Sequence, residues 1–297
     1  MGDINFVLVF SLVVKLATPL LLAALGETMA EASGVIILAL DGLIMLSALA
    51  AFVVAFSSGN LILGAVVGPL VGMLLAAIFG YFVVVQRRDQ FATGLIVGTV
   101  AIAISAYAGN PMVGKPASAM PDLTLPLLGN IPFLQPFLKQ DIFVYLSYLA
   151  AIGLTYYLYR TRPGVTARAI GVNPESAKRR GIPVGRTQYL YILFAGLMAG
   201  LAGAAFTLST KPGWTQNHTL GWGWLALTLV IFGRRNPVWV TLGTYLFTLF
   251  SAAGIIQLFV SALPAQLTGV VPFVLMLIVL LIAGDPSRSR SKAKAGA

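Results

Sequence analysis

Four charged side chains lie within or between the first two long apolar runs, where they could do chemistry away from water. Lys15 lies in the first run, Glu27 and Glu31 follow it, and Asp41 lies about two turns into the second. Charges in a bilayer are costly and commonly mark a pathway or a buried pair. Glu27, Glu31 and Asp41 are therefore candidates for lining a substrate path. The alternative for Asp41 is a hydrogen-bonded structural carboxylate near a helix N-terminus.

Other kinds of site chemistry find little support in the residue types present. The chain has no cysteine and one histidine, His218, which excludes thiolate catalysis, Cys-based metal sites and two-histidine motifs. Gly109, Gly114 and Lys115 fit a phosphate-binding loop, but Pro116 replaces the hydroxyl residue that would hold magnesium. We therefore expect no catalytic residues, no metal and no cofactor. So few titratable groups also disfavour transport driven by ion coupling.

Two tryptophans, Trp222 and Trp224, stand beside a short apolar segment. They could stack on the ring of a small-molecule substrate, and we keep them as candidates for the substrate path. The alternative is that they anchor the segment at the membrane interface, where tryptophan is enriched.

The elements that position these residues must be membrane helices. The 297 residues are 58% hydrophobic and 9% charged, too little polar surface for a soluble globule. The net charge of +10 does not indicate nucleic acid, because the basic residues lie beside apolar runs long enough to span a bilayer. Lipid is therefore an expected partner, and nucleic acid is not.

The apolar runs predict an all-α polytopic membrane protein with about eight full transmembrane helices and one short or re-entrant helix. The short one is residues 221–233, and residues 1–284 form a single transmembrane domain. The predicted segments are 5–25, 35–56, 61–85, 91–107, 142–159, 187–209, 221–233, 237–258 and 262–284.

The basic residues predict the direction of every segment. Fifteen of the nineteen Lys and Arg fall in patches at 87–88, 160–186, 234–235 and 288–294. Cytoplasmic loops are enriched in such residues, so the N-terminus is expected outside, the C-terminus inside, and residues 285–297 form a basic cytoplasmic tail. Residues 108–140, with six prolines, become an irregular external loop. This pattern is typical of a multi-pass protein of the cell (inner) membrane.

Small residues recur at four-residue spacing along two predicted spans. They are Gly64, Gly68, Gly72, Ala76 and Gly80 in the third span and Gly196, Gly200 and Ala204 in the sixth. Such stripes predict close packing of helix backbones. The alternative is that smooth faces let helices slide during gating.

The longest predicted cytoplasmic segment, 160–186, contains a short helix with a defined start and stop. Asn173 suits an N-cap, Pro174 the first helical position, and Glu175 the positive end of the helix dipole. Lys178 favours the C-terminal end, and Gly181 stops the helix. Composition alone leaves open whether this helix contacts a partner or is a solvated anchor of topology.

Three sequence blocks carry a family resemblance. They are ARAIGVNPESAKRRG (167–181), GETMAEASGVIILALDG (26–42) and GWGWLALTLVIFGRRNP (221–237). Over about residues 17–284 the chain resembles permease subunits of ABC importers for nucleosides and simple sugars. It is most similar to the shorter of two paired permeases in nucleoside importers that use a basic-membrane-protein type binding lipoprotein. The broader superfamily includes branched-chain amino acid permeases.

The resemblance implies a transporter subunit rather than an enzyme. Its partners would be an ABC ATPase that hydrolyses ATP, a second permease and an extracytoplasmic substrate-binding protein. The second permease is expected to be a different, longer chain, and a homodimer is the alternative. The segment around α-helical residues 174–180 looks like the coupling helix that docks on the ATPase. The positions that match are Arg168, Gly171, Asn173, Pro174, Glu175, Ala177, Lys178 and Gly181. An ATP-independent channel remains the rival interpretation.

The resemblance leaves the substrate open among nucleosides, simple sugars and branched-chain amino acids. Relatives commonly carry Asn and Glu where this chain has Ile37 and Asp41, and a basic residue where it has Ala32. If this stretch contributes to the path, the ligand or its affinity would differ from the typical nucleoside case.

Overall fold

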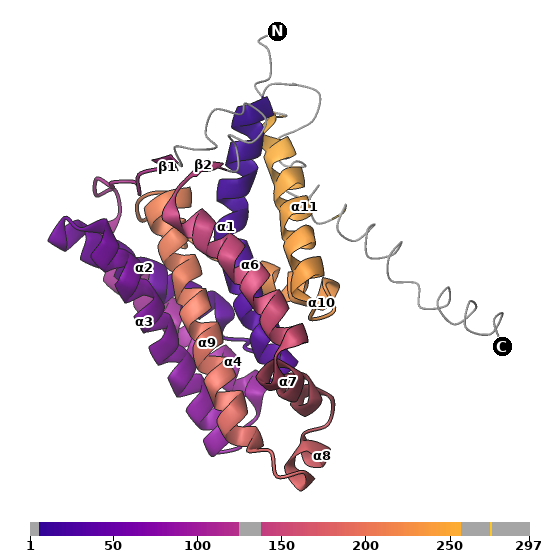
Figure 1. Ribbon diagram of the computed structural model, residues 1–297. Coiled ribbons are helices and arrows are strands. Elements are labelled where there is room, and N and C mark those ends of the chain that lie inside the picture. The colour runs from indigo at the N-terminus through magenta and orange to yellow at the C-terminus, as the bar shows by residue number, and fades with distance from the viewer. Residues whose placement is uncertain (1–5, 125–137, 257–273, 275–297) are drawn as a thin grey trace. The chain divides into compact units, whose positions relative to one another are not determined.

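The structure is a computed structural model that describes residues 6–124, 138–256 and 274 (Figure 1). Its contacts divide the chain into two units, 1–244 and 245–297, and the arrangement described below is that of the first. Within the described residues, six helices are long and apolar enough to cross a membrane: Phe10–Ala32, Leu40–Ser58, Leu61–Val85, Gln90–Met112, Ile142–Arg160 and Val184–Thr210.

The elements are mostly helices, with a long connection between α4 and α6 that holds two short strands. Their order is α1 (Phe6–Ala32), α2 (Leu40–Ser58), α3 (Leu61–Gly80) with the π-helix η1 (Tyr81–Val85), α4 (Gln90–Gly109) with the 3₁₀-helix η2 (Asn110–Met112), β1 (Leu123–Thr124), β2 (Lys139–Gln140), α6 (Ile142–Arg160), α7 (Arg162–Val172), α8 (Pro174–Arg179), α9 (Val184–Ala205) with the π-helix η3 (Phe206–Thr210), α10 (Trp222–Phe232) and α11 (Pro237–Ile256). The two short strands pair antiparallel, with Leu123 opposite Gln140.

Polar residues start the helices where the apolar runs begin. Asn60 accepts a hydrogen bond from the Ile62 amide at the start of α3, and Asp89 accepts one from the Ala92 amide at the start of α4. Each cap satisfies an amide that has no partner inside its helix. Gly59, with φ of 68°, ends α2 in a left-handed conformation that glycine adopts readily.

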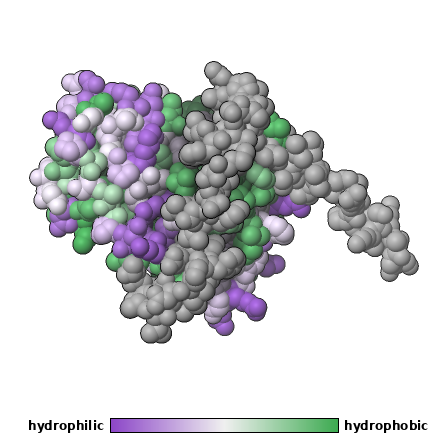
Figure 2. All heavy atoms as spheres, turned by 90° about the horizontal axis from the view of Figure 1, so that it is seen from above, coloured by the Kyte–Doolittle hydropathy of each residue, from purple (hydrophilic) through white to green (hydrophobic). Residues whose placement is uncertain are grey.

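Helices α1, α2 and α9 form the core, and the others surround it. At least two thirds of the most apolar 18-residue stretch of each core helix is buried, against less than a third for α3, α4 and α6. The outer helices keep large apolar side chains exposed, such as Leu74, Ile96 and Ile152. Seen from the end that carries β1 and β2, hydrophilic residues gather on that end and hydrophobic residues show at its margins (Figure 2).

The two small-residue stripes pack against each other, as the packing interpretation predicts. A Cβ built on Gly72 would lie 2.3 Å from the Gly196 carbonyl oxygen, and one on Gly196 would lie 2.2 Å from the Ala76 Cβ. A Cβ on Gly200 would lie 2.5 Å from the Gly68 carbonyl oxygen. The backbones of α3 and α9 therefore meet directly, with no room for larger side chains.

Two predicted boundaries are wrong in a way that matters for the site. Helix α1 continues to Ala32, so Glu27 and Glu31 lie inside it rather than in the connection after it. Helix α2 begins at Leu40, so Asp41 is its second residue rather than two turns inside it. Apolar composition cannot reveal either boundary, since residues 33–39 are as apolar as the helices they join.

The short segment predicted at 221–233 is an eleven-residue helix, α10. The segment predicted at 262–284 lies outside the described residues except for residue 274, and so do residues 125–137 of the proline-rich loop.

Candidate functional site

The predicted short helix of the basic segment is present as α8, and its ends are capped. The Asn173 side chain accepts a hydrogen bond from the Ser176 amide at 2.9 Å, and Pro174 occupies the first turn. At the other end, Gly181 adopts a φ of 78° and its amide donates to the Lys178 carbonyl at 2.9 Å. These local contacts give six residues a fixed shape without help from the bilayer.

Helix α8 is available for contact with another molecule. It lies at the end of the molecule opposite β1 and β2 (Figure 1). Ala177 is its one buried residue, and Glu175 and Lys178 are exposed. The neighbouring Val172 is 86% exposed. The charged side chains of α8 and the neighbouring Val172 are thus open to solvent or to a partner.

Helix α7 joins α8 to the core through two glycine contacts. A Cβ built on Gly171 would lie 2.4 Å from the Ala32 carbonyl oxygen, at the end of α1. A Cβ on Gly164 would lie 2.1 Å from the Tyr157 carbonyl oxygen, on α6. Since backbone rather than a flexible side chain stands in the way, α7 sits this close to α1 and α6 only because both positions are glycine.

Tyrosine hydroxyls connect α9 to α6 and α7. The Tyr157 and Tyr191 hydroxyls lie 3.0 Å apart, and the Tyr191 hydroxyl donates to the Pro163 carbonyl of α7 at 3.2 Å. The Arg168 guanidinium lies over the Tyr159 ring, 4.6 Å from its centroid. Helix α7 thus contacts α1, α6 and α9.

The connection between α1 and α2, residues 33–39, is held by side chains from distant elements. Glu27 is fully buried, and its carboxylate accepts a hydrogen bond from the Ile37 amide at 2.9 Å. Gln188, in the first turns of α9, donates to the Ser33 carbonyl at 3.0 Å. Glu31 forms an ion pair with Arg235, with 3.3 Å between nitrogen and oxygen.

Asp41 holds the N-terminus of α10. Its carboxylate accepts hydrogen bonds from the Gly221 amide at 3.0 Å and the Gly223 amide at 2.8 Å. A Cβ built on Gly223 would lie 2.2 Å from the Asp41 amide nitrogen, so the two chains touch. A carboxylate at a helix N-terminus is favoured by the helix dipole. Asp41 is thus a hydrogen-bonded carboxylate at the N-terminus of α10.

The predicted path candidates are therefore brought together only in part. Asp41 meets the start of α10, where Trp222 packs edge to face on Phe206 with ring centroids 4.6 Å apart. Trp224 is 48% exposed. Glu27 and Glu31 instead hold the connection before α2.

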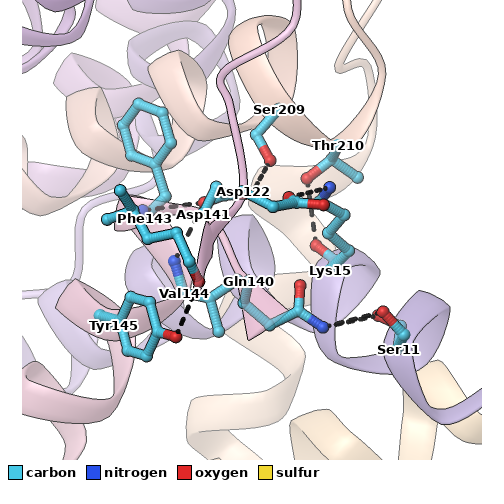
Figure 3. Close-up of polar contacts among 11 residues, drawn as sticks. Ser11, Lys15, Asp122, Gln140, Asp141, Phe143, Val144, Tyr145, Ser209 and Thr210 are labelled. Atoms are coloured by element: carbon cyan, nitrogen blue, oxygen red, sulfur yellow. Dashed lines mark hydrogen bonds and ion pairs between the residues drawn. The ribbon is translucent and has the colours of Figure 1, made fainter. Parts of the chain in front are cut away.

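At the opposite end of the molecule, a polar cluster that sequence reasoning missed joins α1, α6 and η3 (Figure 3). Asp141 is fully buried, accepts from the Phe143 amide at 2.8 Å and receives a hydrogen bond from the Ser209 hydroxyl. Thr210 donates to the Lys15 carbonyl at 3.1 Å. An Asp directly before an apolar run is an N-cap signal, which could have identified Asp141.

Lys15, Asp122 and Gln140 extend the same cluster. The Lys15 ammonium and the Asp122 carboxylate lie 2.8 Å apart, and the Gln140 amide donates to the Ser11 hydroxyl at 3.0 Å. Lys15 is therefore paired with the loop that follows α4 rather than placed on a path through the bilayer.

His218 lies in the connection between η3 and α10, among aromatic rings. Its ring is 5.0 Å from Phe206 and 5.6 Å from Trp214, measured between centroids. One ring nitrogen faces the Lys211 carbonyl, so this nitrogen carries the proton, and the other accepts from Thr215. Burial lowers the pKa of His218 to about 4, which keeps the ring neutral.

A metal centre has no support in the part of the chain that the structure describes. No group of three or more His, Cys, Asp or Glu there could hold an ion. The described residues instead show packing and hydrogen-bond contacts between elements. Helix α8 is capped and exposed, α7 packs on α1 and α6, and the Asp41 carboxylate joins α2 to α10.

Comparison with known proteins places the chain in a family. The family described as "Branched-chain amino acid transport system / permease component" matches residues 9–280. The chain is 34% identical to a putative glucose ABC transporter permease protein of Haloferax volcanii, over 80% of this chain and 74% of the relative. It is 25% identical to a nucleoside ABC transporter permease protein of Lactococcus lactis, over 90% and 89%. It is 28% identical to a guanosine ABC transporter permease protein of Bacillus subtilis, over 84% and 81%.

Proposed function

We propose that this chain, which belongs to the family of branched-chain amino acid transport system permease components, is the membrane-spanning permease subunit of an ATP-driven ABC importer for nucleosides or simple sugars. It is a multi-pass membrane protein without chemistry of its own. A separate ATPase supplies the energy, and the permease moves its substrate by alternating access.

The observation that carries this proposal is the continuous set of contacts from α8 to the core. Helix α8 is exposed and capped, α7 continues from it, and Gly171 of α7 touches the end of α1. The connection after α1 leads to Asp41, which holds α10. A force applied to α8 therefore has a packed route to two helix ends. Packed elements with discrete arrangements are what couples distant sites.

The proposed orientation follows from the same geometry. Helix α8 faces the cytoplasm, where the ATPase is, and the end that carries β1 and β2 faces outward toward a substrate-binding protein. The basic residues of α8 and the pair Arg234 and Arg235 support this direction. The compartment would then be the cytoplasmic (inner) membrane.

A second permease subunit completes the proposed complex. Two ATP sites acting together need two coupling helices, and the described part of this chain offers one, α8. The second subunit is proposed to be a different, longer permease, and the substrate path is proposed to lie between the two subunits. Arg168, Gly171, Asn173, Pro174, Glu175, Ala177, Lys178 and Gly181 are the proposed ATPase-facing or supporting residues.

The substrate is proposed to be a nucleoside, with glucose-type sugars next. Nucleoside and guanosine permeases match 90% and 84% of this chain, and a putative glucose permease matches 80% of it at the higher identity of 34%. Branched-chain amino acids are the third candidate substrate class, because the family description names them. Glu27, Glu31, Asp41, Trp222 and Trp224 remain the proposed supports of the path, and the first three act by holding its helices.

Reconstitution tests this function directly. The chain would be placed in proteoliposomes with its ATPase, second permease and binding protein, and uptake of radiolabelled guanosine and glucose measured with and without ATP. We expect uptake to require ATP hydrolysis and the binding protein. Equal uptake without ATP would overturn the importer and favour a channel.

A further inference from the structure

A groove lies between α6 and the start of α11. Its volume is about 700 Å³, and its wall on α6 runs from Ala151 to Arg160. The facing wall runs from Asn236 to Leu242. Nine residue steps of helix cover about 14 Å, close to half of the roughly 30 Å hydrocarbon core. The groove thus has the length of one leaflet.

The walls of the groove suit hydrocarbon. Ile152 is 72% exposed and Leu242 53% exposed. Two hydroxyls in the walls are already satisfied, since Thr155 donates to the Ala151 carbonyl at 2.6 Å and Thr241 to the Pro237 carbonyl at 2.7 Å. These two hydroxyls therefore need no polar ligand, and an acyl chain would cover the apolar side chains beside them without breaking their hydrogen bonds.

The mouth of the groove at the α8 end is cationic. Arg160 lines it, and Arg168 lies over the ring of Tyr159, which also lines it. The ion pairs within residues 6–124 and 138–256 are Lys15 with Asp122 and Glu31 with Arg235. Neither Arg160 nor Arg168 has a carboxylate partner there, and the Arg168 Nε is buried without a hydrogen bond. Guanidinium groups favour phosphate because their donors match its oxygens.

We propose that this groove binds an anionic phospholipid, with one acyl chain between α6 and α11 and the phosphate on Arg160 and Arg168. Charge complementarity favours lipid over the chain's own predicted span 262–284. That span has no Asp or Glu, and the tail after it holds one Asp against four Lys and Arg. Basic pockets between membrane helices commonly hold such headgroups. The bound lipid would join α6 to α7, the helix that carries α8.

Site-specific quenching tests this lipid site. Because the chain has no cysteine, Ile152→Cys provides a single thiol for a bimane label. The labelled chain is reconstituted in phosphatidylcholine containing increasing fractions of brominated phosphatidylglycerol or brominated phosphatidylcholine. We expect brominated phosphatidylglycerol to quench with saturation at a low mole fraction, and brominated phosphatidylcholine only in proportion to its amount.

Charge variants identify the headgroup contact. In the double variant R160A/R168A, half-quenching should require about 30-fold more phosphatidylglycerol, since each cation contributes roughly a factor of five. The matched control R87A/R88A removes two cations from another basic patch and should leave the curve unchanged. Quenching by phosphatidylcholine in both variants shows that each is folded.

Two results would overturn the proposal. Identical curves for the two brominated lipids would mean that the groove has no headgroup selectivity. No quenching by either lipid would mean that a protein segment, such as residues 262–284 or a second permease, covers Ile152.

Discussion

Replacing Gly171 by alanine tests the link between α7 and the core. The new Cβ would lie 2.4 Å from the Ala32 carbonyl oxygen, whereas ordinary contact begins near 3.4 Å. Helix α7 must therefore retreat from α1 by about 1 Å, because the obstacle is backbone. Forced overpacking of this kind costs about 1–3 kcal/mol. The strain can be relieved by separating α7 from the connection that leads to α2.

The functional result follows from that separation. We expect G171A to keep most of the ATP hydrolysis of the complex while substrate uptake per ATP falls. A coupling loss of about 1–3 kcal/mol corresponds to roughly 5–150-fold. Both rates would be measured in the same proteoliposomes, so that the ratio does not depend on the amount of protein inserted.

Gly185→Ala is the matched control. Gly185 is exposed near the start of α9, and its Cβ would meet only the Val84 side chain at 3.4 Å. G185A should leave the ratio of uptake to hydrolysis unchanged. If G171A and G185A gave the same ratio, the proposed route through α7 would be refuted.

Three further predictions concern stability. D41A removes the acceptor for the Gly221 and Gly223 amides. It should lower the free energy of unfolding, measured with denaturant in detergent, by about 1–3 kcal/mol. D41N should lower it less. G196V should prevent α3 and α9 from packing, because even a Cβ at this position would lie 2.2 Å from the Ala76 Cβ. The amount of G196V protein in isolated membranes should therefore fall. G153A is the control and should not fall, because its Cβ meets nothing within 4 Å. His218 has a pKa lowered from 6.5 to about 4, so the unfolded chain binds more protons between these values, and stability should fall as pH drops from about 6.5 to about 4. Unfolding midpoints across that range should show the loss, and H218Q should flatten it; an equal slope in both would exclude His218 as the cause.

The local features of the site could be predicted because they depend on neighbouring residues. The cap at Asn173, the stop at Gly181 and the short α10 follow from residues within a few positions. The packing of the glycine stripes also follows, since small residues at four-residue spacing leave the backbone open.

Contacts between distant segments could not be predicted from one sequence. Nothing near Gly171 indicates that Ala32 would stand against it, 139 positions away, and nothing near Asp41 names Gly223 as its partner. The sequence also does not locate the end of α1, because Glu27 and Glu31 look like a polar connection until their partners Ile37 and Arg235 are known. A buried carboxylate inside a helix is stable only when such contacts compensate its burial.

The central claim is that α8 is the surface through which an ATPase moves this permease. Its most direct test is cross-linking from Ser176→Cys, an exposed position of α8 in a chain without other cysteines, to cysteines introduced on the ATPase subunit. We predict a cross-link whose yield changes with bound nucleotide and which abolishes ATP-driven uptake, whereas Tyr107→Cys, 87% exposed on α4, gives none. An actively transporting complex in which Ser176→Cys never cross-links to the ATPase would contradict the account.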